Sequence, residues 1–147
     1  MVSTYCSLRA HIVFSTKERK RYIAREWRSS FHEYLGGTVR GLEAVAEAVG
    51  GVDDHVHLLV SYRPTLALAD FVRELKKAST NWATEKQGPQ FSWQEGYSVF
   101  SVSASQKDRV ARYIANQEIH HRTRTFRQEL VTLPRRHEVE FKPEYLD

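Results

Sequence analysis

Two predicted strands in the middle of the sequence are joined by only two aspartates, so they are expected to pair as an antiparallel hairpin. The first covers residues 42–52, which are rich in Ala and Glu, and the second covers the mostly apolar residues 55–62. Two further strands are predicted from β-branched and aromatic residues, over residues 5–16 and 97–103. The chain is therefore expected to form its fold around antiparallel β-structure.

Helical periodicity fills the segments between these strands. Residues 23–36 carry apolar side chains every three or four positions, and Gly36-Gly37 is expected to end that helix. Residues 66–86 repeat the pattern after Thr65, which can cap a helix. The capping box Ser105–Asp108 is expected to start another helix, which runs to about residue 121.

The resulting order, β-α-β-β-α-β with an added C-terminal helix, predicts an α+β fold of the ferredoxin-like type. Two helices would cover one face of a four-stranded antiparallel sheet and leave the other face free. We expect one domain over residues 1–147, with a core over about residues 5–130 and a tail over residues 131–147.

The composition excludes several classes of protein. The lone Cys6 rules out an internal disulfide and a multi-cysteine zinc site, and it fits a reducing cytoplasm. No apolar run approaches the ~18 residues of a membrane span, and we see no secretory signal, so a cytoplasmic protein is expected. The net charge of +4 is compatible with a polyanionic partner.

The first candidate site is the triplet His55-Val56-His57. Because side chains alternate along a strand, His55 and His57 share one face, and Val56 lies on the opposite, core-facing side. Two neighbouring imidazoles suit a divalent metal ion. A chain with 7 histidines can contain such a pair by composition alone, so the pair does not establish a metal site by itself.

The second candidate site is the pair Tyr113 and Gln117, four residues apart on the last predicted helix and therefore on one face. Gln117 offers a neutral oxygen ligand, and a tyrosine hydroxyl can act as a nucleophile. The ordinary tyrosine pKa is about 10, so the hydroxyl needs help, for example from a metal ion that polarises a phosphate. The structural alternative is a packed Tyr113 and a solvated Gln117.

Together, Asp54–Leu59 and Tyr113–Gln117 resemble the HUH (His-hydrophobe-His) single-tyrosine transposases, which move small bacterial insertion sequences and include the REP-associated tyrosine transposases. The one departure is Val52-Asp53, where a small or apolar residue and proline are more usual, and it affects the turn and not the ligands. The resemblance reaches about residue 130 and also covers His11–Phe14, Thr16-Lys17, Phe91–Tyr97 and Phe100–Val102.

The resemblance implies that His55, His57 and Gln117 hold one Mg²⁺ or Mn²⁺ while Tyr113 attacks a phosphate of single-stranded DNA. The products would be a 5′-phosphotyrosine link and a free 3′-hydroxyl, and the 3′-hydroxyl of a second strand would resolve the link. No nucleotide cofactor is then needed, in agreement with the absence of a Gly-rich phosphate loop. Because the imidazoles must be neutral to bind metal, activity is expected to fall below the ordinary His pKa of about 6.5.

The implied partners are single-stranded or hairpin DNA and a second copy of the chain, because family members often form dimers in which the tyrosine helix meets the partner's histidines. Clustered basic residues could follow a phosphate backbone and loop aromatics could stack on bases, although a solvated face and core packing are the alternatives. These DNA-binding candidates are Lys17, Arg19, Lys20, Arg21, Arg73, Lys76, Lys77, Phe91, Trp93, Arg122 and Arg124.

Three more residues have open roles. Asp54 either orients a ligand imidazole or initiates the turn before the strand. We expect His11 to be structural and His121 to face the surface or a phosphate. Two other functions also stay open: a non-catalytic module that binds single-stranded nucleic acid, and a domesticated REP-associated nuclease that acts on palindromic hairpins.

Overall fold

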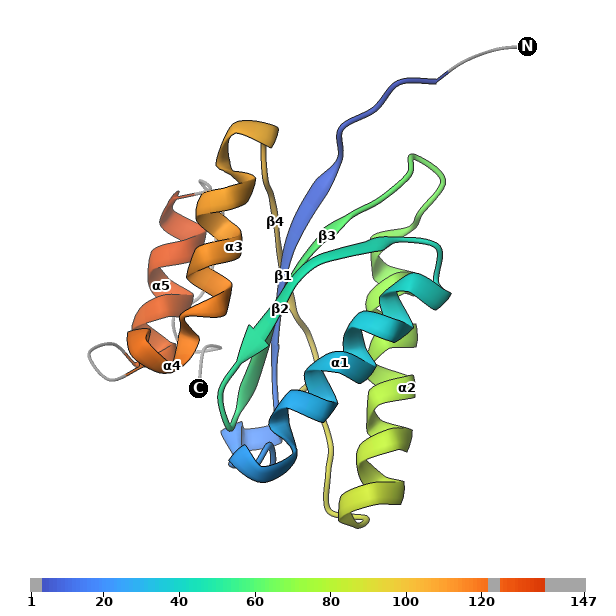
Figure 1. Ribbon diagram of the computed structural model, residues 1–147. Coiled ribbons are helices and arrows are strands. Elements are labelled where there is room, and N and C mark those ends of the chain that lie inside the picture. The colour runs from blue at the N-terminus through green and yellow to red at the C-terminus, as the bar shows by residue number, and fades with distance from the viewer. Residues whose placement is uncertain (1–3, 122–124, 137–147) are drawn as a thin grey trace.

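The computed structural model describes residues 4–121 and 125–136. It contains a four-stranded sheet with helices on both faces (Figure 1). The strands are β1 (Arg9–Ser15), β2 (Val45–Gly51), β3 (His55–Ser61) and β4 (Ser98–Ser101). They lie in the order β2-β3-β1-β4, and every neighbouring pair is antiparallel. The expected α+β architecture with a four-stranded antiparallel sheet is therefore confirmed.

The helices divide between the two faces of the sheet (Figure 1). One face is covered by α1 (Arg25–Gly41) and α2 (Leu68–Gln87), and the other by α3 (Lys107–Ala115) and α5 (Phe126–Arg136). The short helix α4 (Gln117–His120) follows α3, and the 3₁₀ turns η1 (Lys17–Arg19) and η2 (Ala104–Gln106) follow β1 and β4. Within the described residues, no helix is both long and apolar enough to cross a membrane.

The side chains of β3 alternate between the two faces of the sheet, as the sequence predicts. Val56, Leu58 and Val60 join the large core beneath α1 and α2. Leu59, from the opposite face, packs instead with Ile114 of α3. His55 and His57 share the face of Leu59, so they point toward the C-terminal helices.

The expectation of a free sheet face is wrong. Val13 and Phe100 on this face pack against Phe126 and Leu133 of α5, and α3 packs over β2 and β3. An apolar sheet face cannot stay exposed at low cost, and the C-terminal helices supply its cover. As a result, the two histidines lie in the interior between the sheet and these helices.

Several predicted ends of helices are also wrong. Gly36-Gly37 does not end α1, because Phe31, Leu35 and Val39 form one buried stripe that continues to Gly41. Burial of that stripe outweighs the cost of about 1 kcal/mol for a glycine inside a helix. Likewise α2 begins at Leu68 after Ala67, so Thr65 is not its cap.

The predicted helix over residues 105–121 is two helices. Its first residues form η2, with no side-chain hydrogen bond at the cap, so the expected capping box is absent. Asn116, with φ −101° and ψ 23°, leaves the helical conformation and separates α3 from α4. Tyr113 therefore lies in the last turn of α3, and Gln117 begins α4.

Phe91 and Trp93, predicted to stack on bases, belong to an aromatic cluster over α1 and α2. Phe91 is only 4% exposed, and its ring centroid lies 5.6 Å from that of Phe31. The indole of Trp93 packs edge-on against Phe14 and donates a hydrogen bond to Ser79 Oγ. This placement favours the alternative of core packing for both side chains.

Candidate functional site

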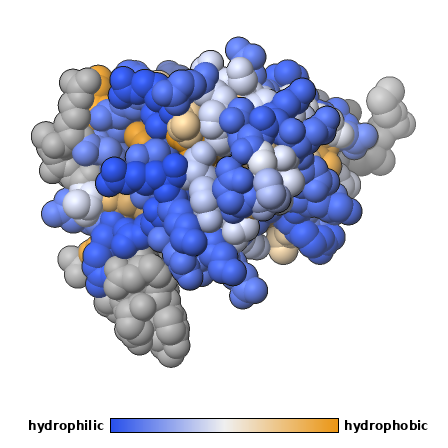
Figure 2. Space-filling model, turned by 90° about the horizontal axis from the view of Figure 1, so that it is seen from below, coloured by the Kyte–Doolittle hydropathy of each residue, from blue (hydrophilic) through white to orange (hydrophobic). Residues whose placement is uncertain are grey.

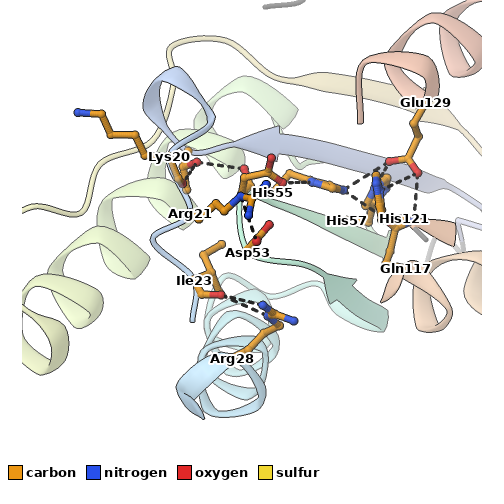
Figure 3. Close-up of polar contacts among 12 residues, drawn as sticks. Lys20, Arg21, Ile23, Arg28, Asp53, His55, His57, Gln117, His121 and Glu129 are labelled. Atoms are coloured by element: carbon orange, nitrogen blue, oxygen red, sulfur yellow. Dashed lines mark hydrogen bonds and ion pairs between the residues drawn. The ribbon is translucent and has the colours of Figure 1, made fainter. Parts of the chain in front are cut away.

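The site is centred on His55 and His57, which are wholly buried side chains on β3. The ring centroids of the two imidazoles lie 5.1 Å apart. Polar groups from α4, the residue after it, and α5 converge on them: Gln117, His121 and Glu129 (Figure 3). Gln117 and Glu129 are each only 1% exposed, whereas the His121 side chain is 14% exposed, so the cluster is buried except on the His121 side.

His55 is held from two sides. Its Nδ1 donates a hydrogen bond of 2.7 Å to Asp54 Oδ1, and Gln117 Oε1 lies 3.0 Å from its Nε2. Phe126 of α5 stacks on the imidazole with a centroid separation of 3.8 Å and an interplanar angle of 8°. These contacts fix the plane of the ring and direct Nε2 toward the centre of the cluster.

His57 lies between an acid and a third histidine. Its Nε2 donates to Glu129 Oε1 over 2.6 Å, and its Nδ1 lies 2.8 Å from His11 Nε2 on β1. A neutral His57 satisfies both contacts if Nδ1 accepts the proton of His11 Nε2. His11, 2% exposed, therefore supports His57 from behind, in agreement with its expected structural role.

The surroundings drive the two imidazoles toward opposite charge states. Burial opposes a charge on His55, but the hydrogen bonds and negative charges of Asp54 and Glu129 raise its pKa to about 9. Burial lowers the pKa of His57 to about 4 despite its bond to Glu129, and the charge of His55 adds to this effect. Burial opposes ionisation of Glu129, but hydrogen bonds from His121, His55 and His57 hold its pKa far below the usual range.

The donor atoms fit a divalent metal ion. An octahedral ion with bonds of about 2.1 Å needs neighbouring ligand atoms roughly 3 Å apart. Here Glu129 Oε1 lies 2.6 Å from His57 Nε2 and 3.5 Å from His55 Nε2, and Gln117 Oε1 lies 3.0 Å from His55 Nε2. One nitrogen or oxygen each of His55, His121 and Glu129 also lies within 4.8 Å of the others. Imidazole, amide and carboxylate groups are all ligands of divalent metal ions.

Tyr113 lies beside this cluster. Its ring centroid is 5.7 Å from that of His57 and 6.1 Å from that of His11, edge-on in both cases. The half-buried ring also lines a hollow that reaches the surface between α3 and α5. The structure thus brings together Tyr113, Gln117 and the two histidines, although the helix between Tyr113 and Gln117 is broken.

A second, basic hollow opens on the His55 side of the cluster. It has a volume of about 420 Å³ and includes Asp54, His121 and Phe126, which surround His55. Four arginines from η1, from α1 and from the segment between them also line it: Arg19, Arg21, Arg25 and Arg28. Figure 2 views the molecule from this end, where the surface is mostly hydrophilic.

The predicted DNA-binding residues are distributed unevenly around the site. Lys17, Lys20 and Arg21 are exposed at or next to η1, and Arg19 is half-buried there. Arg73 and Lys77 are exposed on α2, which covers the opposite face of the sheet (Figure 1).

Lys76 has a structural contact, because its Nζ donates to the carbonyl oxygens of Gln94 and Gly96. Burial lowers the pKa of this lysine. Arg122 and Arg124 lie outside the described residues.

Sequence reasoning missed two members of the cluster, His121 and Glu129. His121 follows Gln117 by four residues, and this spacing could have indicated a shared helical face. Glu129 carries no comparable local signal, because it reaches the site only through the packing of α5 against β1 and β4.

Comparisons with known proteins identify the family to which this chain belongs. A family model described as "Transposase IS200 like" matches residues 4–117. The ISDra2 transposase TnpA of Deinococcus radiodurans is 29% identical over 119 residues, which cover 75% of this chain and 84% of that protein.

Two solved structures share the fold. One, described as a transposase from Deinococcus radiodurans R1, has a TM-score of 0.65 at 24% identity and covers 80% of this chain and 95% of its own. The other is a REP-associated tyrosine transposase bound to a REP hairpin, with a TM-score of 0.61 at 14% identity. The match covers 82% of this chain and 73% of that one. Since the family match spans most of the chain and includes the His pair, Tyr113 and Gln117, the protein belongs to the IS200-like transposases, the HUH single-tyrosine family that its sequence resembles.

Proposed function

We propose that this transposase cleaves and rejoins single-stranded DNA through a covalent link between Tyr113 and a 5′-phosphate. The observation that carries the proposal is the convergence of His55, His57 and Gln117 beside the Tyr113 ring within one chain. A purely binding module has no need for such a buried cluster of imidazoles and carboxylate, so that alternative is disfavoured.

In the first step, the Tyr113 oxygen forms a bond to phosphorus and the bond from phosphorus to the 3′-oxygen breaks. The 3′-oxygen leaves with a proton, and the tyrosine hydroxyl gives up its own proton to water. In the second step, the 3′-hydroxyl oxygen of another strand forms a bond to phosphorus and gives its proton to water, while the bond from phosphorus to Tyr113 breaks and the tyrosine oxygen takes up a proton from water. One phosphorus–oxygen bond forms for each that breaks, so no nucleotide hydrolysis is required.

His55, His57 and Gln117 are the residues that would hold a divalent metal, with Glu129 within reach as an anionic ligand. The metal, when bound, would polarise the scissile phosphate and stabilise its developing charge. Asp54 would keep the His55 Nδ1 proton in place, so that Nε2 stays directed toward the ion. With Nε2 free to face an ion, His57 would carry its proton on Nδ1 and donate a hydrogen bond to His11 Nε2, the reverse of the tautomer described above for the metal-free cluster.

Single-stranded or hairpin DNA is the proposed substrate. The basic hollow lined by Arg21, Arg25 and Arg28 leads to the residues around His55, so it could hold the phosphates next to the scissile one. The REP-associated relative is bound to a REP hairpin, which supports a DNA partner of this kind. The homodimer expected from the family stays a prediction.

The proposal is tested with a labelled single-stranded oligonucleotide that carries the DNA flanking the gene. The wild-type protein with Mg²⁺ or Mn²⁺ is expected to form a covalent adduct that survives a denaturing gel, and EDTA is expected to abolish it. Tyr113→Phe removes only the hydroxyl, so DNA binding should persist while the adduct disappears. Tyr97→Phe, at an exposed tyrosine, is the matched control and should form the adduct normally. Adduct formation by Tyr113→Phe at the wild-type rate would overturn the proposal.

A further inference from the structure

The hollow that Tyr113 lines has a chemistry different from that of the basic hollow. It has a volume of about 590 Å³, within the range of roughly 300–1,000 Å³ for ligand pockets. It lies between the end of β4, η2, α3 and α5. Its inner end is formed by Tyr113 and His11, so it meets the histidine cluster from the His57 side.

The walls of this hollow are apolar and its rim is polar. Val102, Val110 and Leu133 supply the apolar wall, and Val102 and Leu133 are each 7% exposed. Gln106 and Arg109 are exposed side chains at the same opening. An apolar wall with a few hydrogen-bonding groups at its edge matches a nucleobase, which has apolar faces and polar edges.

The spacing along α3 connects this hollow to the reacting group. Val110 and Tyr113 are three residues apart, so they lie on one side of α3, and Gln106, the residue before the helix, lines the same hollow. A nucleotide whose phosphate is next to Tyr113 can therefore place its base against Val110 without leaving this face. The arginines of the basic hollow would then hold the backbone on the His55 side.

We propose that this hollow binds one unstacked nucleobase of a nucleotide that flanks the scissile phosphate. Its role is to fix the position of the strand, because a base seated beside Tyr113 limits where the neighbouring phosphate can lie. Arg109 at the rim would contact a phosphate or the polar edge of the base. The inference rests on the proposed function, because it takes Tyr113 as the attacking residue.

The test combines a filled hollow with DNA that lacks single bases. Val110→Trp fills the space from α3, and Val45→Trp, at a valine that is 57% exposed on β2, is the matched control. The probes are cleavable oligonucleotides from the DNA that flanks the gene, each with one abasic position near the mapped cleavage site. Affinity is measured for each probe and each protein by fluorescence anisotropy.

One abasic position is expected to weaken binding to the wild-type protein by about tenfold, the loss typical of one base contact. Val110→Trp should weaken binding of intact DNA by a similar factor. It should cause little further weakening when the DNA already lacks that base. Val45→Trp should match the wild-type protein on every probe. If Val110→Trp does not fold, Gln106→Trp at the rim allows the same comparison.

The proposal is overturned if no abasic position matters, or if Val110→Trp weakens intact and abasic DNA equally. These outcomes differ from failure of the proposed function. That failure would appear as the absence of a Tyr113 adduct from the wild-type protein. A failed base pocket would leave adduct formation intact in the wild-type and Val45→Trp proteins.

Discussion

At the scale of single residues, the site places two neighbouring histidines in opposite protonation states. His55 lies between the carboxylates of Asp54 and Glu129, and this raises its pKa to about 9. His57 shares Glu129 but is dominated by burial and by the charge of His55, so its pKa falls to about 4. Between these values His55 is an imidazolium and His57 is a neutral imidazole.

Metal binding is expected to release about one proton. The folded pKa of His55 is near 9, so at pH 7.5 a metal ion must displace the Nε2 proton. The apparent affinity for Mn²⁺ should rise about tenfold per pH unit from pH 7 to 9 and level off above that. Calorimetry in two buffers of different ionisation enthalpy measures the released proton. A heat of binding independent of the buffer would contradict this expectation, as would a transition at the pH of about 6.5 expected for an unperturbed histidine.

Glu129→Gln should lower the pKa of His55 from about 9 toward its ordinary value. The amide keeps the shape of the side chain but removes the negative charge that favours the imidazolium. The raised pKa stabilises the fold below pH 6.5 and this contribution disappears as pH rises through 9, so the variant should lose stability mainly at neutral and lower pH. An NMR titration of the imidazole protons measures the shift. Glu47→Gln, which alters a pair with Arg9 on β2, is the control and should leave His55 unchanged.

At the scale of secondary-structure elements, the position of Tyr113 depends on how closely α3 approaches β2. The contact occurs at Gly50, where an added Cβ would lie 2.2 Å from the backbone oxygen of Ile114. A backbone oxygen cannot rotate away as a side chain can, so any larger residue at this position must displace α3. Tyr113 precedes Ile114 directly, and Gln117 begins the next helix.

Gly50→Ala is therefore expected to destabilise the fold by about 1–3 kcal/mol, as overpacking does elsewhere. It should also slow formation of the covalent adduct, because α3 moves relative to His57. Urea denaturation and the adduct assay measure the two effects. Gly41→Ala is the control, because an added Cβ there meets nothing within 4 Å. Equal stability of the two variants would show that α3 accommodates the methyl group.

Phe91→Ala tests whether the loop before β4 belongs to the core or to a DNA-binding surface. Phe91 is packed among Phe31, Trp27 and Trp93, so its truncation should cost about 3–5 kcal/mol of stability. The folded fraction of the variant should bind single-stranded DNA as the wild-type protein does. Tyr97→Ala, at a ring that is 44% exposed, should cost much less stability. Weakened DNA binding without loss of stability would restore the base-stacking hypothesis for Phe91.

The sequence predicts those parts of the fold and site that depend on local periodicity. Alternation along residues 55–61 assigns His55 and His57 to one face, and the structure agrees. Local pattern cannot show that Asn116 interrupts a helix, or that Leu35 and Val39 carry α1 past Gly36-Gly37. Those outcomes depend on which surface the helix packs against. Glu129 joins the cluster through tertiary packing alone, which is why no motif around it indicated a role.

At the scale of the whole molecule, the two hollows flank the histidine cluster and differ in chemistry. The hollow on the His55 side is lined by four arginines together with Asp53, Asp54 and Glu118, so arginine is its commonest charged residue, whereas the hollow on the His57 side is mostly apolar. A single strand of DNA has the same division, with charged phosphates along one side and apolar bases along the other. The net charge of +4 is modest, so this local arrangement matters more than the overall charge.

The salt dependence of DNA binding should reveal the basic hollow. Arg28 donates to the carbonyl oxygen of Ile23 and pairs with Glu118, so Arg21 and Arg25 are the better choices for removal. The Arg21 side chain is 84% exposed, and its ion pair with Asp53 is long, at 3.6 Å. Exposed ion pairs of this kind contribute little to stability. Arg25 is also an exposed side chain, so both arginines can turn toward a phosphate at small cost.

Each phosphate contact on a single strand contributes about 0.7 to the slope of log affinity against log salt. The double variant Arg21→Ala/Arg25→Ala should therefore bind more weakly at low salt, with a slope reduced by about 1.4. Arg63→Ala removes an exposed arginine from a different hollow, formed by the segments next to β1 and β3, and should leave the slope unchanged. Titrations of one oligonucleotide at four or more salt concentrations give the three slopes. If the double variant and Arg63→Ala lower the slope equally, the DNA senses only the net charge, and the backbone does not follow the basic hollow to His55.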